Sequence, residues 1–347
     1  MPVTGPGSAV IIVGMTLPDD ITVVPLPHPA DPWLVEGMVQ VTREAMLADA
    51  GDDDGAPTVR ELAELVLPTA YRRRPTVVAL DGRAGERPSA VVGHGYASLP
   101  LTDNLHLALV GVAVRPAHRR RGIGAALWEQ VLATVRAEGR TTCLAATEHP
   151  ADVPADPALR VEAATGSGVV GVDAATRFLQ ARGFALAQVE RRSRLEVPMG
   201  PDDAERLAAM VAAGRERQVG YDVVSWHGRV PDRWLGDVAE LFRRMSTDVP
   251  LGELDHVEEV WDAARVRTAF DEHAARGLVP WVSAIRHVAT DTLVAFTVLL
   301  VPDERPEIAY QEDTIVMVEH RGRRLGAWVK QANYLNLTAG DPACGGC

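Results

Sequence analysis

The chain has 347 residues, which is long enough for two domains with separate cores. Its composition, 47% hydrophobic and 24% charged residues, is typical of a globular protein and argues against a disordered one. The formal net charge of −12 argues against a general nucleic-acid binder, because such a protein needs a basic face for the phosphate backbone.

The cysteine content and the hydropathy pattern indicate in which compartment the chain is expected. The three cysteines (Cys143, Cys344 and Cys347) are too few for a disulfide framework, which fits a reducing cytoplasm. The C-x-x-C at the end has no third or fourth ligand nearby, so we expect an irregular tail and no metal. The apolar run 9–15 is too short to span a bilayer. We expect a cytoplasmic monomer or homodimer without membrane or nucleic-acid partners.

The N-terminal half alternates predicted strands and helices. Residues 1–20 are rich in Gly and Pro around one strand-like piece at 9–13. Asp31 occupies the cap position of the next predicted helix. Up to residue 99, the pattern predicts strands at 21–27, 76–80 and 90–99 and helices at 32–50 and 60–67.

The most informative stretch is 105–138, which predicts a strand, a basic turn and a long amphipathic helix. The strand is the apolar run 107–114, and the helix has an apolar residue at every fourth position from Ile123 to Val135. Two glycines, Gly122 and Gly124, lie where that helix begins. Unpaired N–H groups at a helix start form an anion site, and flanking arginines add charge and bidentate phosphate geometry. The pattern therefore predicts a pyrophosphate site. A solvated arginine cluster on a surface turn is the alternative.

These residues resemble a known motif. V-x-V-x-P-x-x-R-x-x-G-x-G is similar to the acetyl-CoA-binding motif of the GNAT superfamily of N-acetyltransferases. A dinucleotide-binding or P-loop site fits worse, because there is no G-x-G-x-x-G and no lysine in the turn. The resemblance implies that acetyl-CoA is the cosubstrate and that it is bound by Val112, Ala113, Val114, Arg119, Arg120, Arg121, Gly122, Ile123, Gly124 and Ala125.

The rest of this half completes the order of elements of the GNAT fold, an α/β (α+β) fold with a mixed, mostly antiparallel sheet flanked by helices. We expect a strand at 142–146, a helix at 173–183 and a last strand region at 184–197. The resemblance thus covers a domain from 21 to 198, and residues 198–203 are the expected linker.

The second half repeats the first. Arg321 aligns with Arg119, an offset of 202 positions, and Gly326 then aligns with Gly124. Gly122, however, is matched by Arg324. Strand-like segments at 281–287, 293–301 and 308–318 support a second, diverged copy within 199–347. Only about twenty residues follow the start of its motif helix, so this copy is expected to be incomplete. Its CoA site is expected to be weak or absent.

The resemblance also indicates where catalytic groups would be. In the family, the motif strand parts from its neighbour, and backbone N–H groups there bind the thioester carbonyl. Many relatives have a glutamate base on this strand, but that position is Ala108 here. His106 is the nearest titratable substitute, and Glu148, with His149 beside it, is an alternative.

Many relatives also have a tyrosine acid near the end of the last helix, at the position of Leu179. Tyr96 is the candidate for that role, and a purely structural aromatic in the sheet is the equal alternative. In the second copy, Tyr310 matches Ala108, and Glu312 lies on the motif strand as a further catalytic candidate.

The sequence thus predicts a tandem GNAT enzyme that transfers an acetyl group to the amine of a small molecule. Its layout resembles mycothiol synthase and the tandem GNAT proteins of antibiotic gene clusters. The alternative is a non-catalytic acyl-CoA-binding or sensing protein, which the missing Glu and Tyr favour.

Overall fold

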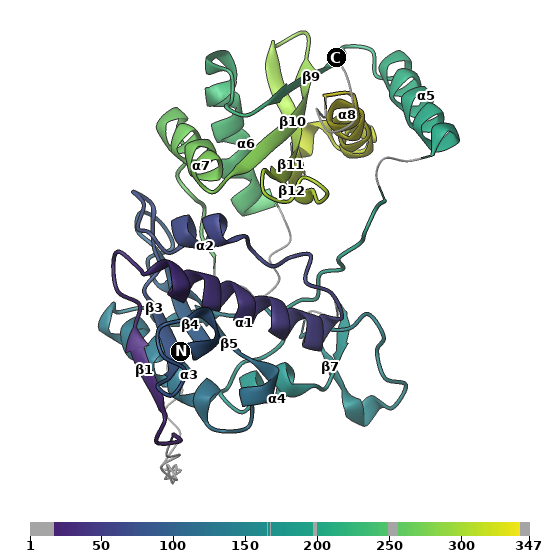
Figure 1. Cartoon of the computed structure of the whole chain (residues 1–347). Coiled ribbons are helices and arrows are strands. Elements are labelled where there is room, and N and C mark those ends of the chain that lie inside the picture. Colours follow the sequence, from purple (N-terminus) through teal and green to yellow (C-terminus); the bar gives the residue numbers. More distant parts are fainter. Residues whose placement is uncertain (1–16, 165, 167, 197–199, 249–255, 341–347) are drawn as a thin grey trace.

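The computed structural model of the chain describes residues 17–164, 166, 168–196, 200–248 and 256–340. The strand expected at 9–13 and the pair Cys344 and Cys347 lie outside the described residues. Figure 1 shows two stacked units, an N-terminal one from purple to teal and a C-terminal one from teal (α5) through green to yellow. Each unit has its own sheet and its own hydrophobic core.

The N-terminal unit is built on a mixed sheet with the strand order β1-β3-β4-β5-β6, and β2 pairs with β4. All of these pairings are antiparallel except β5 with β6, which confirms the predicted mixed, mostly antiparallel sheet. The elements are β1 (Ile21–Pro25), α1 (Pro32–Ala50), α2 (Val59–Leu65), β2 (Arg72–Arg73), β3 (Thr76–Asp81), β4 (Val91–Pro100), β5 (Leu107–Val114), α3 (Ile123–Ala137), β6 (Thr142–Leu144), β7 (Arg160–Glu162), β8 (Val169–Gly171) and α4 (Ala174–Gln180).

Helices cover both faces of this sheet. The apolar stripe of α3 packs on one face, with Ile123, Leu127 and Val131 almost fully buried. The helix α1 packs on the other face through residues such as Leu34 and Met38. Because side chains alternate along a strand, β4 and β5 contribute to both cores.

Local signals explain most of the helix ends. Pro32 starts α1 as predicted, although the side chain of Asp31 at the cap position accepts no capping hydrogen bond. A capping box between Thr58 and Glu61 starts α2. A second capping box, formed by Asp173 and Thr176, starts α4.

The C-terminal unit repeats this order around an antiparallel sheet, β9-β10-β11-β12. Even the strand register is repeated. His94 is opposite Ala113 in the first unit, and the residues 202 positions further on, Phe296 and Ile315, are opposite each other in the second. Within the described residues no strand corresponds to β6. Its elements are α5 (Pro201–Arg217), β9 (Tyr221–His227), α6 (Leu235–Asp248), α7 (Ala263–Ala275), β10 (Leu278–His287), β11 (Thr292–Pro302), β12 (Tyr310–Val316) and α8 (Leu325–Gly340).

Two predicted segments differ from the structure. The prediction of a strand at 184–197 is wrong for its described part, 184–196, which has no regular structure. Its arginines Arg192 and Arg194 instead reach the acidic loop after α1, where they pair with Asp52 and Asp54. The predicted linker also ends too late, because α5 begins at Pro201. Proline at the first helical position and acidic residues in the first turn both favour a helix start there.

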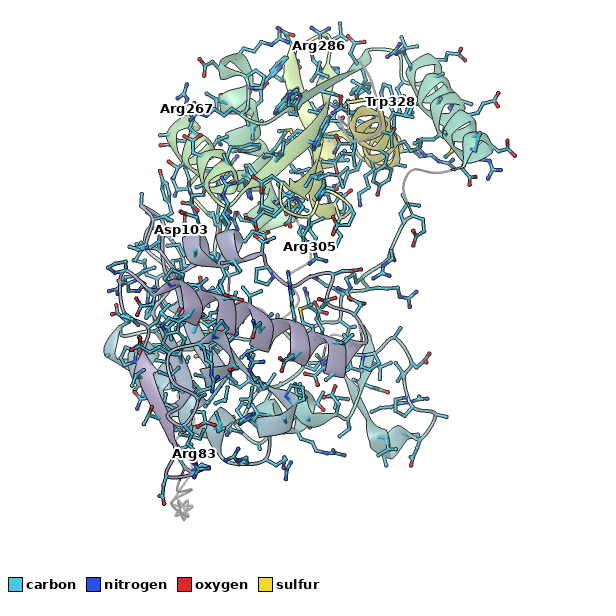
Figure 2. All side chains as sticks on the ribbon, viewed as in Figure 1. Arg83, Asp103, Arg267, Arg286, Arg305 and Trp328 are labelled. Atoms are coloured by element: carbon cyan, nitrogen blue, oxygen red, sulfur yellow. The ribbon has the colours of Figure 1, made fainter. Side chains whose placement is uncertain are left out.

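Polar contacts join the two units. Asp103, which precedes β5, binds Arg265 of α7. Asn104 exchanges hydrogen bonds with the backbone of Val257. Figure 2 shows Asp103 and Arg305 on the two sides of this junction, and Trp328 between α8 and α5. Within the described part of the chain, no helix has the length and apolar character needed to cross a membrane.

Candidate active site

The predicted anion site lies where α3 begins. Gly122 is the N-cap residue and has a φ of 87°, and Arg120 two residues earlier also has a positive φ of 63°. Positive φ is readily accessible to glycine, which has no Cβ to clash with the backbone. The N–H groups of the first turn have no partner inside the helix, and the positive end of the helix dipole lies behind them. This end of α3 can therefore hold a phosphate group.

The corresponding turn of the C-terminal unit has the same backbone conformation, but its glycine lies at the first of the two positions with positive φ instead of the second. Gly322 has a φ of 79° and Arg324 a φ of 59°, matching Arg120 and Gly122 in the first unit. An exposed arginine thus occupies the helix start where the first unit has no side chain. This is the substitution that the repeat alignment indicated.

The three arginines of the turn differ in their surroundings. The side chain of Arg119 is turned inward and bonds both the carboxylate of Asp49, near the end of α1, and the carbonyl of Val114. Arg120 and Arg121 are exposed, and Nη1 of Arg121 lies 3.2 Å from Nδ1 of His118. The side chains available to an external anion are therefore Arg120 and Arg121 rather than Arg119.

The motif strand parts from its neighbour as it approaches the turn. β5 pairs with β6 only from Leu107 to Leu109, whereas its pairing with β4 continues to Val114. The backbone N–H of Thr142 donates to the carbonyl of His106, so the backbone polar groups of His106 point toward β6. Every second residue of a strand points its N–H and C=O to the same side. The N–H groups of Val110 and Val112 therefore also point toward this side, where β6 is no longer paired with β5.

The position of the usual base is apolar. Ala108 is fully buried in the core beneath α3. His106 lies in the turn just before β5, at the end where β5 and β6 are still paired. Six residues of extended strand, roughly 20 Å, separate it from Val112. This placement argues against His106 as the group that removes a proton from an acceptor amine.

The segment after β6 brings Glu148 close to the loop after α1. Its Oε1 lies 3.5 Å from the position that a Cβ on Gly55 would occupy, and its Oε2 is 3.6 Å from Nη1 of Arg192. Glu148 is exposed. His149 is instead fixed between Thr147 and Asp173, at 2.7 Å from each.

Tyr96 lies on the face of β4 that is turned away from α3. It is opposite Gly111 of β5, and its ring covers that glycine so closely that a Cβ there would meet the ring at 2.8 Å. Glycine at this position leaves room for the ring. The phenol thus lies over the part of β5 from which β6 has departed, and it remains partly accessible.

Two partners of this region carry no motif and were missed in the sequence. Arg74 stacks on Tyr96 with its Cζ 3.6 Å from the ring centroid, and burial, opposed in part by Tyr96, lowers the pKa of Arg74 to about 10. His94 is buried beside Tyr96 on the same face, and burial together with the charge of Arg74 lowers its pKa to about 4. The alternation of His94, Tyr96 and Ser98 along one strand is the signal that would have found His94, whereas nothing in the sequence marks Arg74.

The two candidates of the second copy lie at the junction. Tyr310 Oη donates to the carbonyl of Asp54 in the loop after α1, at 2.9 Å. β12 has an irregularity between the pairs Thr297–Thr314 and Leu299–Gln311, and Glu312 lies in it. Burial, and to a lesser extent the charge of Asp313, raises the pKa of Glu312. The fold therefore brings Tyr310 into contact with the N-terminal unit, and Glu312 lies two residues further along the same strand.

Comparison with known proteins agrees with this geometry. Residues 44–160 match the acetyltransferase (GNAT) family. The structure is similar to a tandem GNAT protein from the clavulanic acid biosynthesis pathway, with a TM-score of 0.62 and 23% identity over 93% of this chain and 87% of that one. It is also similar to a GCN5-related N-acetyltransferase from Sphaerobacter thermophilus, with a TM-score of 0.53 and 13% identity over 93% and 84% of the two chains. No curated protein matches the sequence. Residues 44–160 therefore match the acetyltransferase (GNAT) family, and the chain as a whole has the fold seen in a tandem GNAT protein.

Proposed function

We propose that the N-terminal unit transfers an acetyl group from acetyl-CoA to the amine of a small molecule. The observation that carries this proposal is the combination of two features on one strand–turn–helix segment. Among the described residues, β5 has no strand partner beyond Leu109 on the side of β6, and the turn that follows β5 leads through Gly122 into α3. Such an edge suits an extended amide-containing chain, and such a turn suits a pyrophosphate.

The residues present fit acetyl-CoA. A Cβ on Gly124 would make only ordinary contacts, at 3.6 Å from Phe178 and Val114, so internal packing does not require glycine there. Close approach of a ligand to the helix start is a sufficient reason for it. The pyrophosphate would be held by the N–H groups of residues 123–125 with the exposed Arg120 and Arg121, and the thioester would lie along Val110–Val114. Acetyl-CoA supplies the activated acyl group.

The protein's own groups then have two roles in the transfer. The N–H groups of Val110 and Val112 stabilise negative charge on the carbonyl oxygen. The acceptor nitrogen forms a bond to the carbonyl carbon as the C–S bond breaks. Tyr96 donates a proton to the departing thiolate, and the amine releases its proton to water, which restores the phenol. Tyr96 takes this role because it is the partly accessible acid that covers β5 at Gly111.

The acceptor must also become a neutral amine before it attacks, and the apolar Ala108 cannot take the proton that its ammonium form loses. The exposed Glu148 and Glu312 are the carboxylates proposed to accept this earlier proton through water. In the C-terminal unit, Arg324 stands at the helix start, and we propose that this unit contributes to the acceptor side rather than binding acetyl-CoA.

The buried Ala108 also favours a second function, a non-catalytic acyl-CoA-binding protein. A thiol-release assay with acetyl-CoA and a panel of small amines separates the two, and calorimetric titration with acetyl-CoA provides the matching binding measurement. Gly122→Glu should abolish binding, because it places a carboxylate against the pyrophosphate, whereas Gly322→Glu should not. Binding that survives Gly122→Glu unchanged would reject the site, and binding without any thiol release would support the second function.

A further inference from the structure

The helix α7 of the C-terminal unit is held across the N-terminal unit at both of its ends. Near its start, Arg265 binds Asp103 and lies over the ring of Tyr71, with Cζ 5.0 Å from the centroid. At its end, the carbonyls of Ala274 and Ala275 accept hydrogen bonds of 3.1 and 3.0 Å from Arg60 of α2. Figure 1 shows α7 and α2 facing each other across the junction. These contacts at both ends hold α7 against the segment from α2 to β3.

Three partly buried arginines meet at this junction. Arg72 lies in β2, Arg74 follows it, and Arg276 comes directly after α7. Among the described residues, none of the three has a carboxylate oxygen within 4.0 Å. Their partners are uncharged: Arg72 donates to the carbonyl of Leu65 at 2.9 Å, and Arg74 stacks on Tyr96.

Arg276 is oriented by a neutral imidazole. Its Nη2 lies 2.8 Å from Nδ1 of His273, and its Nε donates to the carbonyl of Glu272 at 3.3 Å. Burial, and then the charge of Arg276, lowers the pKa of His273 to about 4, so the ring is uncharged at neutral pH and accepts this hydrogen bond. The imidazole thus fixes the guanidinium without cancelling its charge.

The three cations are close enough to affect one another. Burial is the largest cause that lowers the pKa of each, and Arg72 and Arg276 lower that of Arg74 further. The carboxylates of Glu272, Glu61 and Glu312 act in the opposite direction on Arg276. Glu61 is itself engaged in the cap of α2. Bringing three guanidinium groups together without a contacting carboxylate costs free energy, which a bound anion would offset.

The cluster adjoins the proposed site of transfer through a single side chain. Arg74 stacks on Tyr96, and Tyr96 covers Gly111 of β5. An anion held by the cluster would therefore lie on the same face of the sheet as the phenol. Glu312 on β12 is close enough to Arg276 for their charges to affect each other, so this region carries both signs. This arrangement is suited to a molecule that carries both an amine and a carboxylate.

We propose that the acceptor is an amino acid or a similar aminocarboxylate, whose carboxylate is bound by Arg72, Arg74 and Arg276 at the junction of the two units. This rests on the proposed acetyl transfer to an amine. Planar guanidinium groups bind carboxylates in a bidentate manner, which gives the specificity for the acid over its amide. The second copy of the fold would thus supply part of the acceptor site.

The test compares each amino acid with its amide in the thiol-release assay of the full chain. The acid should have a kcat/KM about tenfold or more above that of the amide, the difference expected when charged hydrogen bonds are lost. Arg276→Gln should remove this preference, and Arg276→Lys should restore part of it. Arg73→Gln is the matched control, because Arg73 lies between Arg72 and Arg74 but is exposed and pairs with Glu138.

A second readout does not depend on activity. The N-acetyl derivative of each standard amino acid and its amide are added to the full chain at equal ionic strength, and the shift in Tm is measured. At least one acid should raise Tm more than its amide in the wild type and in Arg73→Gln, but not in Arg276→Gln or Arg72→Gln. If no acid exceeds its amide, or if the excess persists in both of these variants, the aminocarboxylate site is rejected. A selective shift without thiol release would reject acetyl transfer while keeping the anion site.

Discussion

Arg119 donates two parallel hydrogen bonds to Asp49, from Nη1 to Oδ1 at 2.6 Å and from Nη2 to Oδ2 at 2.9 Å. Its Nε also donates to the carbonyl of Val114 at 3.1 Å. The second unit retains this arrangement: Nε of Arg321 donates to Val316, and its Nη2 lies 3.9 Å from the carboxylate of Asp248 at the end of α6. The arginine of the motif thus joins the end of α1 to the turn that starts α3 in the first unit, and the end of α6 to the turn that starts α8 in the second.

The first prediction concerns this role. Asp49→Ala and Arg119→Ala should each weaken acetyl-CoA binding by a similar small factor, about threefold to fivefold, because both loosen the turn. Both side chains are partly exposed, so the pair itself contributes at most about 1 kcal/mol. Calorimetric titration measures both variants, with Asp52→Ala as control. A loss in Arg119→Ala more than tenfold above that in Asp49→Ala would show that Arg119 contacts the phosphates directly.

The second prediction assigns the proton donor. Tyr96→Phe should lower kcat for thiol release by about a hundredfold while leaving the Kd for acetyl-CoA unchanged, because only the hydroxyl is removed. His106→Ala should change kcat/KM by less than threefold, because His106 lies at the paired end of β5. Steady-state kinetics of both variants over a range of pH tests this. A large loss of activity in His106→Ala together with an altered pH profile would show that His106 is the general base.

The third prediction concerns the junction. The side chains of Asp103 and Arg265 are 6% and 11% exposed, so removing the charge of Asp103 leaves Arg265 buried with only the more distant carboxylate of Glu259, 3.7 Å away. Asp103→Asn should lower the free energy of unfolding by about 3 kcal/mol, measured by urea denaturation. Asp303→Asn, which breaks the exposed pair with Arg60, should cost less than 1 kcal/mol. Equal losses in the two variants would contradict the buried role of Asp103.

This pair also has a pH dependence. Burial tends to raise the pKa of Asp103, but the hydrogen bonds from Arg265 and the backbone of Val260 lower it overall. A carboxyl with a lowered pKa stabilises the folded state above its unfolded value near 4, and this contribution is lost as the pH falls through the lower folded value. Below pH 4, the free energy of unfolding of Asp103→Asn should therefore change less with pH than that of the wild type.

The fourth prediction concerns His94. The Thr42 hydroxyl donates to the carbonyl of Met38, so Nε2 of His94 donates to that hydroxyl, at 2.9 Å. Its Nδ1 is buried and has no partner among the described residues. The folded pKa, about 4, lies below the unfolded value of 6.5, so the stabilisation is complete above pH 6.5 and is lost as the pH falls toward 4.

Over this interval His94 should account for a loss of up to about 3 kcal/mol in the free energy of unfolding, since one pKa unit corresponds to about 1.4 kcal/mol. His94→Gln should be less stable at pH 7 but should lose less stability between pH 6.5 and pH 4.5. Urea denaturation at a series of pH values measures both. Parallel curves for the variant and the wild type would refute the assignment.

Much of the N-terminal unit could be predicted from the sequence because its signals are local. The motif strand ends at Val114, where Arg115–Pro116 follows, and the helix begins at Ile123 after the glycine turn. The repeat at an offset of 202 residues was visible for the same reason, since each copy carries its own strand, turn and helix. Here periodicity, caps and turn residues agree with the fold.

Tertiary structure decided what these local pieces do. Nothing near Arg119 in the sequence indicates that Asp49, seventy residues away, binds its guanidinium. Arg74 and Arg276 carry no motif, and they adjoin one region only because α7 docks on the other unit. Residues 184–196 have the composition of a strand, but their arginines are paired with the acidic loop after α1. The local sequence pattern determines where most helices and strands form. The partner of a charged side chain depends instead on which distant segment packs beside it.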